Sequence, residues 1–377
     1  MDTQSHKKKI VAAVISSYAY IRGHNNYGSI LQYYALQQYL TKFNVEAYWI
    51  RYMFSPVSMY RHLLKRIIRY LYHGFRIKNC WNHIRTQREF QKFMHNKCRI
   101  SRVKYKSISS LKENPPQADL YVTGSDQVWG GWLEPNYLTF APQGKPRVAY
   151  AASFGKQELT EEHQLRISSW VKSFDAVSVR EASGVEICRK MGIEAVHLLD
   201  PTLLLDVDDY LPSNVIRSEK NEYIFCYFIN ETNPQNLRLN DIIQYSEKER
   251  LKLKITAIEG PELVVPSQYL CQYSPEGWLN HYKYAKCIFT NTFHGVVFCI
   301  IFRKQFCVFT QTGFSVKQNE RLYSILKLFE LEGRILEPGK SVSDVIGKKI
   351  NWEKIELIKS QSRIQTENFW HEILNKF

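Results

Sequence analysis

Short apolar runs alternate along the chain with stretches in which apolar residues recur at helical spacing. Six runs rich in β-branched and aromatic residues are expected to form strands of one sheet: 9–15, 45–50, 120–123, 147–151, 176–179 and 195–199. Four later runs are expected to form a second sheet: 223–229, 253–258, 287–290 and 306–309. Strands that alternate with helical patterns are typical of parallel α/β layers.

A polar stretch separates the two series of strands. It begins at Asp200-Pro201-Thr202 and continues over 206–221, where Asp, Pro, Ser and Lys are frequent, so we expect a domain linker here. The pattern therefore predicts an α/β domain over 1–205 and another over 206–350. Apolar residues recur at helical spacing from Trp352 to Phe377, which predicts a C-terminal helix over 351–377 that packs back across the domains.

The composition suits two folded cores. The chain has 377 residues, of which 44% are hydrophobic and 14% aromatic, so extensive disorder is excluded. Its eight cysteines include no C-x-x-C pair and are expected to be reduced core residues, with no metal site. Because no run approaches the roughly 20 apolar residues that span a bilayer, and the apolar stretch after Lys7-Lys8-Lys9 is short for a secretory signal, we expect a cytoplasmic protein.

The net charge of +15 comes almost entirely from one segment. Between Arg61 and Lys106, fourteen Lys and Arg face a single acid, Glu89. We expect a basic helical insert over 55–110 in the first domain. Apolar and basic residues alternate at helical spacing over 61–71, which is compatible with a helix packed on that domain or with one that lies on an anionic membrane surface.

The junction after the first strand carries the first candidate binding residues. Asn25, Asn26, Tyr27 and Gly28 lie between that strand and a helix that begins near Ser29. Polar residues and glycines at the carboxyl end of a parallel strand are typical of ligand sites in such folds, and helix amides favour anions. The alternative is an ordinary turn in which Ser29 caps the helix.

The strand over 120–123 ends in a second polar motif, Gly124-Ser125-Asp126-Gln127-Val128-Trp129. A carboxylate, an amide and an indole at one strand end suit a sugar, because the indole offers a face for stacking and Asp126 accepts hydrogen bonds from hydroxyls. Equally, Asp126 could cap the next helix while Trp129 fills the core.

Two further strand ends favour an anion. Arg180 follows the strand over 176–179, and its planar guanidinium suits a carboxylate or a phosphate. Asn291, Thr292, His294 and Gly295 follow the strand over 287–290 and open an apolar helix, whose N-terminus would offer backbone amides and an imidazole. A lone histidine is more often structural, but the neighbouring glycine would let a ligand approach the backbone.

In this order, the motifs resemble those of the polysaccharide pyruvyl transferase family. The matching stretches cover much of residues 8–330: Asn26-Tyr27-Gly28, 31–36, 124–129, 150–155, Ser178-Val179-Arg180-Glu181, 199–204, 290–295 and Asn319-Glu320-Arg321-Leu322. One departure is Thr292, where many members carry serine, and a hydroxyl is retained. The resemblance implies an α/β, GT-B-like fold with two Rossmann-type domains whose parallel sheets face a central cleft.

The resemblance also implies a function. It predicts transfer of a pyruvyl group from phosphoenolpyruvate, a co-substrate rather than a cofactor, to a galactose-type sugar as a 4,6-ketal. The acceptor is expected to be a lipid-linked precursor of a surface or capsular polysaccharide, which would place the enzyme on the inner face of the cytoplasmic membrane through 61–106. The first domain would bind the acceptor and the second the donor.

The implied roles fall on the candidate residues above. His294, Arg180 and Asp126 are the expected catalytic residues: His294 as acid/base, Arg180 for the donor, and Asp126 to orient or deprotonate an acceptor hydroxyl. Donor contacts are expected from Arg180, Asn291, Thr292, His294, Gly295, Lys304 and Arg321. Acceptor contacts are expected from Asn25, Asn26, Tyr27, Gly28, Asp126, Gln127 and Trp129. Because Arg180 and His294 are expected to line the cleft, their substitution by alanine should leave the protein folded.

Two other functions are compatible with parts of the sequence. A nucleotide-sugar-dependent glycosyltransferase would use the same fold. The two enzymes can be distinguished by whether phosphoenolpyruvate or a nucleotide sugar stabilises the protein against heat. A basic nucleic-acid-binding protein would explain the charge at 61–106, but no nucleic-acid motif accompanies that segment, so no nucleic-acid partner is expected.

Overall fold

A seven-stranded parallel sheet organises the first half of the protein in the computed structural model, which describes residues 9–16, 25–52, 68, 77–217, 219, 221–258 and 260–376. Its strand order is β3-β2-β1-β4-β5-β6-β7. The strands are β1 (Ile10–Ile15), β2 (Val45–Tyr52), β3 (Ile100–Tyr105), β4 (Leu120–Thr123), β5 (Arg147–Ala152), β6 (Ala176–Val179) and β7 (Val196–His197).

A four-stranded parallel sheet organises the second half, in the order β11-β10-β8-β9. Its strands are β8 (Tyr223–Ile229), β9 (Lys252–Ile258), β10 (Cys287–Thr290) and β11 (Gln305–Val308). Every run that the sequence pattern predicted as a strand is one. The fold is therefore GT-B-like, with two Rossmann-type domains built on parallel sheets, as predicted.

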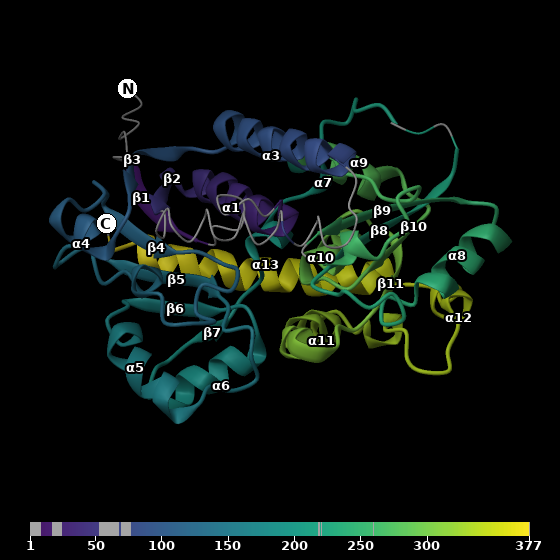
Figure 1. Ribbon diagram of the computed structural model, residues 1–377. Coiled ribbons are helices and arrows are strands. Elements are labelled where there is room, and N and C mark those ends of the chain that lie inside the picture. Colours follow the sequence, from purple (N-terminus) through teal and green to yellow (C-terminus); the bar gives the residue numbers. More distant parts are fainter. Residues whose placement is uncertain are drawn as a thin grey trace, which may run out of the picture.

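Helices cover both sheets (Figure 1). In the first half these are α1 (Tyr27–Leu40), α3 (Ile77–Lys97), α4 (Ile108–Glu113), α5 (Glu161–Val171), α6 (Ala182–Lys190) and α7 (Val207–Tyr210). In the second half they are α8 (Leu239–Lys248), α9 (Pro275–Tyr284), α10 (Phe293–Ile301), α11 (Asn319–Leu328), α12 (Val342–Ile346) and α13 (Trp352–Leu374). The cysteines described at 226, 287, 299 and 307 are buried, unpaired thiols in the second half.

We predicted a basic helical insert over 55–110, but the described residues of this segment are only partly helical. It contains α3, but it also contains β3, which pairs in parallel with β2 at the edge of the first sheet. The pattern concealed β3 because Arg102, Val103 and Lys104 are all exposed, so the strand lacks the apolar run of a central one. The amphipathic pattern predicted for 61–71 lies outside the described residues, except for Ile68.

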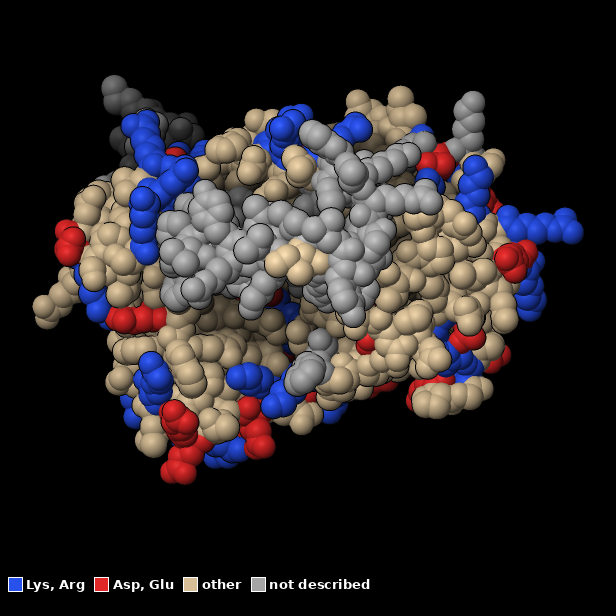
Figure 2. Space-filling view, in the orientation of Figure 1, with Lys and Arg blue, Asp and Glu red and all other residues tan. Residues whose placement is uncertain are grey.

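Acidic side chains accompany the basic ones on the surface. On the face that Figure 2 shows, the Lys and Arg atoms are interspersed with Asp and Glu atoms. Within α3, for example, Lys92 pairs with Glu89 at 2.7 Å.

The two halves pack directly on each other. Tyr27, at the start of α1, stacks on Trp278 of α9 with the ring planes 9° apart, and its hydroxyl donates to the Tyr273 carbonyl at 2.8 Å. The helix α13 runs along both halves (Figure 1). Near its end, Trp370 is fully buried against Tyr150 of β5. This packing holds the carboxyl ends of strands from both sheets close together.

Candidate active site

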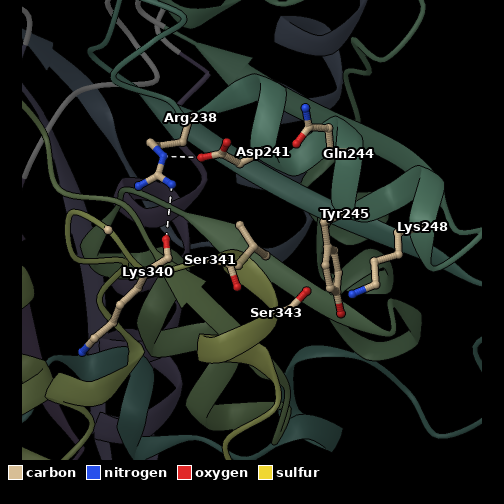
Figure 3. A pocket seen from close by; sticks show the side chains of 10 residues that line it. Arg238, Asp241, Gln244, Tyr245, Lys248, Lys340, Ser341 and Ser343 are labelled. Atoms are coloured by element: carbon tan, nitrogen blue, oxygen red, sulfur yellow. Dashed lines mark hydrogen bonds and ion pairs between the residues drawn. The ribbon is translucent and has the colours of Figure 1, made fainter.

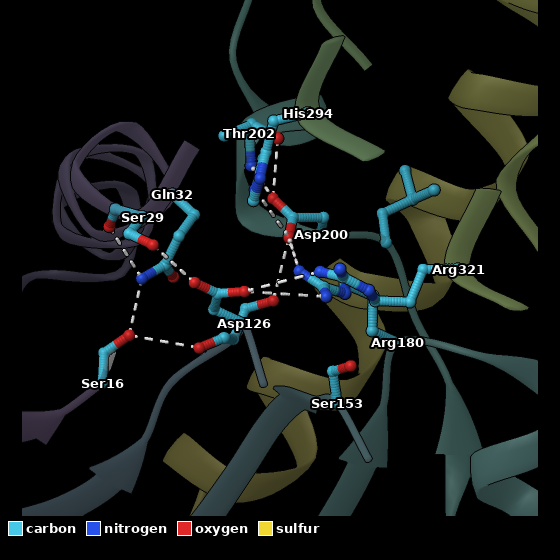
Figure 4. Close-up of polar contacts among 12 residues, drawn as sticks. Ser16, Ser29, Gln32, Asp126, Ser153, Arg180, Asp200, Thr202, His294 and Arg321 are labelled. Carbon is cyan, nitrogen blue, oxygen red and sulfur yellow. Dashed lines mark hydrogen bonds and ion pairs between the residues drawn. The ribbon is translucent and has the colours of Figure 1, made fainter. Parts of the chain in front are cut away.

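Four polar side chains meet where strands of the two sheets end (Figure 4). Asp126 follows β4, Arg180 follows β6, Asp200 lies beyond β7, and His294 lies on the first turn of α10 after β10. The first three come from the first half of the chain and His294 comes from the second. The site is therefore formed only when the two halves are packed together.

Arg180 is the centre of this cluster. Its side chain is only 1% exposed and contacts three carboxylates: Nη1 is 2.9 Å from Asp200 Oδ2, Nε is 3.3 Å from Glu181 Oε1, and Nη2 is 3.8 Å from Asp126 Oδ1. The guanidinium also lies over the ring of Phe293, 4.2 Å from its centre. Burial alone would lower the pKa of Arg180, but the three carboxylates raise it above its ordinary value.

Asp200 links Arg180 to His294. One carboxylate oxygen, Oδ1, accepts from the Thr202 amide at 3.0 Å and from its hydroxyl at 2.6 Å. The other, Oδ2, accepts from Ser125 Oγ and lies 3.6 Å from His294 Nε2. Burial opposes ionisation, but His294, Arg180 and Thr202 hold the pKa of Asp200 well below its usual range.

Asp126 has an unusual backbone conformation with φ at +71°. Its side chain accepts from Ser29 Oγ at 2.7 Å, so the carboxylate is tied to the first turn of α1. The side chains of Gln32 and Ser16 extend this network behind Ser29 (Figure 4). Although burial raises the pKa of Asp126, the nearby cations, led by Arg180, bring it below its ordinary value.

His294 fits against α1 because residue 28 is glycine. A Cβ at position 28 would lie 2.0 Å from His294 Nδ1, so any larger residue would displace the imidazole. Thr292 caps α10, its hydroxyl accepting from the Gly295 amide at 2.7 Å. Gly295 is needed for this tight turn, since a Cβ there would lie 2.0 Å from Thr290 Oγ1.

Arg321, on α11, completes the cluster. Its Nη1 is 4.0 Å from Asp126 Oδ1, and its Nη2 donates to Gln318 Oε1 at 2.9 Å. Burial, reinforced by repulsion from Arg180, lowers the pKa of Arg321 to about 10.

Three nitrogen atoms in the cluster lack a hydrogen-bond partner among the described residues: Arg180 Nη2, Arg321 Nε and His294 Nε2. Each belongs to a side chain that is less than a tenth exposed. Buried donors without partners are costly, and here they come from three elements that face one another. The arrangement suits the oxygen atoms of an anionic ligand.

The predicted acceptor residues fall into two groups. Gln127 is exposed beside Asp126, whereas Trp129 is fully buried among Tyr137 and Phe154 and donates to the Asn136 carbonyl. Trp129 therefore presents no free ring face to a sugar. In the α1 junction, Asn26 caps the helix by accepting from the Ser29 amide, Asn25 is buried, and the Tyr27 ring is stacked between the two halves.

Two predicted donor residues serve other contacts. Asn291 binds the backbone of Ile229 through both its amide atoms, at 2.9 and 2.8 Å, and so joins the ends of β8 and β10. Lys304 follows the last turn of α10, at the opposite end of that helix from His294, and donates to the Ala285 carbonyl at 3.0 Å. The structure thus brings Arg321 to the cluster but not Lys304.

Sequence reasoning missed several members of the cluster. Asp200 was assigned to the domain linker, but it is buried and starts a 3₁₀ helix, Pro201–Leu204, whose residues are also buried. The sequence did contain a sign of this: Asp200 lies within a strongly apolar stretch, Leu198 to Leu205, and a carboxylate buried there requires a polar or charged partner. Glu181 is likewise buried and accepts from Ser153 Oγ at 2.5 Å.

A separate pocket of about 330 Å³ lies between α8 and α12 (Figure 3). Arg238, Lys248 and Lys340 contribute cations to its lining, with Ser341 and Ser343 opposite α8. Arg238 forms an ion pair with Asp241 and donates to the Lys340 carbonyl at 3.3 Å. None of the candidate site residues lines this pocket.

The described residues include neither a metal-ligand cluster nor a membrane-spanning helix. Among those residues, no group of three or more His, Cys, Asp or Glu side chains could hold a metal ion. No helix in the same part of the chain is long and apolar enough to cross a bilayer.

Comparison with known proteins identifies the family. A sequence model described as polysaccharide pyruvyl transferase matches residues 26–312, which is most of the chain and includes Asp126, Arg180, Asp200 and His294. The chain belongs to the polysaccharide pyruvyl transferase family. It is therefore a transferase that acts in polysaccharide pyruvylation. No curated protein sequence gives a significant match.

Solved structures support the fold of this pyruvyl transferase. The S. aureus MnaA–UDP co-structure superposes with a TM-score of 0.57 at 9% identity, covering 98% of each chain. A Listeria monocytogenes structure assigned as a UDP-N-acetylglucosamine 2-epimerase gives a TM-score of 0.53 at 8% identity, covering 95% of this chain and 91% of the other. At such low identities the likeness concerns the GT-B-like fold alone.

Proposed function

We propose that this pyruvyl transferase uses phosphoenolpyruvate as donor and forms a 4,6-ketal on a galactose-type sugar of a lipid-linked surface or capsular polysaccharide precursor, releasing phosphate. The observation that carries the proposal is a set of buried nitrogens on Arg180, Arg321 and His294 that lack hydrogen-bond partners among the described residues, in a member of this family. Two of them, Arg180 Nη2 and His294 Nε2, lie 3.8 and 3.6 Å from carboxylate oxygens, beyond hydrogen-bond distance. Phosphoenolpyruvate has a carboxylate and a phosphate, so it supplies the oxygen atoms that such donors require.

The donor is held by the arginines that retain free N–H groups. Within the described part of the chain, Arg321 Nε has no hydrogen-bond partner, and repulsion from Arg180 helps to lower the pKa of Arg321, so an anion beside it would offset that repulsion. In Arg180 only Nη2 lacks a hydrogen-bond partner among the described residues, because the other nitrogens bind Asp200 and Glu181, and it lies 3.8 Å from Asp126 Oδ1. We assign the main donor contact to Arg321 and a supporting contact to Arg180.

His294 moves the proton in the proposed reaction. A sugar hydroxyl adds to C2 of the donor while C3 takes up a proton. The bond between C2 and the phosphate oxygen then breaks, and phosphate leaves with the bonding electrons. A second hydroxyl attacks C2 and completes the ketal. One hydroxyl proton therefore ends on C3, and the other leaves with phosphate. Imidazole accepts and donates protons near neutral pH, and His294 Nε2 faces the cluster without a hydrogen-bond partner among the described residues.

Asp126 orients the acceptor. A carboxylate whose pKa lies below its ordinary value is a weak base at neutral pH, but it is a strong hydrogen-bond acceptor. Ser29 fixes Oδ2 of Asp126, whereas Oδ1 takes part only in the longer ion pairs with Arg180 and Arg321, at 3.8 and 4.0 Å, and can still accept from a sugar hydroxyl. Of the two roles predicted from sequence, orientation is thus better supported than deprotonation.

A lipid-linked acceptor would bring the enzyme to the inner face of the cytoplasmic membrane. The basic segment 61–106 is our proposed contact with anionic lipid there, since each Lys or Arg near such a surface contributes about 1 kcal/mol. The reaction as written needs no metal ion or organic cofactor.

Thermal stabilisation by candidate donors tests this function. Phosphoenolpyruvate should raise the melting temperature of the purified protein in a concentration-dependent way, and uridine nucleotides should not. Arg321→Ala should abolish the shift caused by phosphoenolpyruvate, whereas Lys304→Ala, the matched control outside the cluster, should preserve it. Stabilisation by a nucleotide sugar alone would instead favour a glycosyltransferase and would count against the proposal.

A further inference from the structure

A second indole lies beside the buried Trp129 and is exposed. Trp132 has 45% of its surface accessible, and it is the only tryptophan among the exposed large apolar residues of the described chain. The guanidinium of Arg166, on α5, lies 4.6 Å from the centre of its ring, and His163 contacts it edge-on at 5.2 Å. Trp132 is thus supported from α5 and keeps part of its ring in solvent.

Trp132 lies at the end of the loop that begins at Asp126 in the candidate active site. Two loops run outward from the cluster side by side: residues 124–132 after β4 and residues 153–156 after β5. The Ser153 amide donates to the Asp126 carbonyl at 3.1 Å, and the Trp129 amide donates to the Ser153 carbonyl at 3.1 Å. Farther out, Lys156 Nζ donates to the Gly130 carbonyl at 3.0 Å. These contacts fix the loop from Asp126 to Gly130, two residues before Trp132.

Parts of the loop that leads from Asp126 to Trp132 are open to solvent. Gln127 is exposed, and a Cβ at Gly131 would meet no atom within 4 Å. Five residues lie between Asp126 and Trp132, and the six residue steps that join them span at most about 22 Å when extended. A sugar bound at Asp126 and the next sugar of the same oligosaccharide fit within this span.

We propose that Trp132 forms an acceptor subsite, on which a sugar next to the one being pyruvylated stacks. This inference rests on the proposed function, because it takes the acceptor to be an oligosaccharide. An indole offers the apolar face of a pyranose a flat surface, and Arg166 behind it can donate to the hydroxyls at the ring edge. The subsite would favour extended acceptors over single sugars.

Binding of two probe acceptors tests the subsite. Methyl β-galactoside carries the reacting sugar alone, whereas methyl β-lactoside carries the same galactose extended by a glucose. Dissociation constants are measured by NMR titration for the wild type, Trp132→Ala, Trp132→Phe and Leu165→Ala. Leu165 is the matched control, being an exposed neighbour of Arg166 on α5.

We expect Trp132→Ala to weaken lactoside binding between about twofold and tenfold relative to galactoside binding, the range that corresponds to aromatic stacking. Trp132→Phe should retain most of the affinity, and Leu165→Ala should bind both probes as the wild type does. Equal effects on both probes, no effect on either, or failure of the wild type to bind the lactoside would overturn the inference. Phosphate release from phosphoenolpyruvate is followed separately: its absence with lactoside binding intact would refute the proposed function alone.

Discussion

Replacing Arg180 by alanine should destabilise the protein strongly, whereas the sequence led us to expect only that this variant stays folded. The side chain is 1% exposed and lies against Asp126, Asp200 and Glu181. Removing one partner of a buried ionic cluster leaves the others without compensation, which typically costs about 3–5 kcal/mol. Because a folded domain is stable by only about 5–15 kcal/mol, this loss is a large fraction of the total.

Arg321 provides the contrast within the same cluster. Its pKa is lowered to about 10 by burial and by repulsion from Arg180, so removing its charge relieves part of an unfavourable interaction. Arg321→Ala should therefore destabilise the protein less than Arg180→Ala, while it weakens donor binding more. The charge of Arg180 would then have a mainly structural role, and the charge of Arg321 would serve mainly to bind the donor.

Urea unfolding followed by circular dichroism measures this difference. Arg180→Ala should unfold at a clearly lower urea concentration than the wild type, with Arg321→Ala in between. Arg180→Lys should recover part of the loss, since it restores the charge but not the planar fork. Arg189→Ala is the control, because Arg189 forms an exposed ion pair on α6 and should leave the midpoint unchanged. A wild-type midpoint for Arg180→Ala would refute the assigned structural role.

Two further predictions concern the same cluster. Gly28→Ala should lower turnover by about 100-fold, because the new Cβ would displace His294 by an ångström or more. Gly333→Ala is the control, since a Cβ there would meet only the end of a flexible lysine side chain and should leave turnover unchanged. Equal activity of the two variants would contradict the packing of His294 against Gly28. Because the pKa values of Asp126 and Asp200 are lowered in the folded state, their contribution to stability is present above the ordinary carboxyl range and is lost as the pH falls below about 4. Melting temperatures measured from neutral pH downward should show this loss of stability. Asp200→Asn should make the melting temperature fall less steeply with decreasing pH. The same pH dependence in Asp200→Asn and the wild type would show that Asp200 is not the group responsible.

The strands could be predicted because most are buried on both faces. All seven residues of β8, for example, are buried, so its apolar run is continuous and unmistakable in the sequence. The strand β3 was missed because an edge strand pairs through its backbone and can carry exposed, charged side chains. Backbone pairing of this kind leaves little trace in the pattern of apolar residues.

The candidate site was predicted less completely than the strands. Strand ends identified Asp126, Arg180 and His294, since parallel strands gather their carboxyl ends at one edge of a sheet. Burial could not be read from the residues alone: Trp129 and Trp132 lie three positions apart, and only the structure distinguishes the core indole from the exposed one. Asp200 was assigned to a linker because its partners, Arg180 and His294, are distant in sequence.

Turnover with a defined donor and acceptor tests the proposed pyruvyl transfer itself. The purified enzyme is incubated with phosphoenolpyruvate and methyl β-lactoside; released phosphate is measured, and the sugar product is examined by NMR. We expect stoichiometric phosphate and a 4,6-linked pyruvate ketal on galactose, with turnover reduced about 10²–10⁴-fold in His294→Ala. Phosphoenolpyruvate that stays intact beside a bound acceptor, or equal turnover by the wild type and His294→Ala, would contradict this expectation.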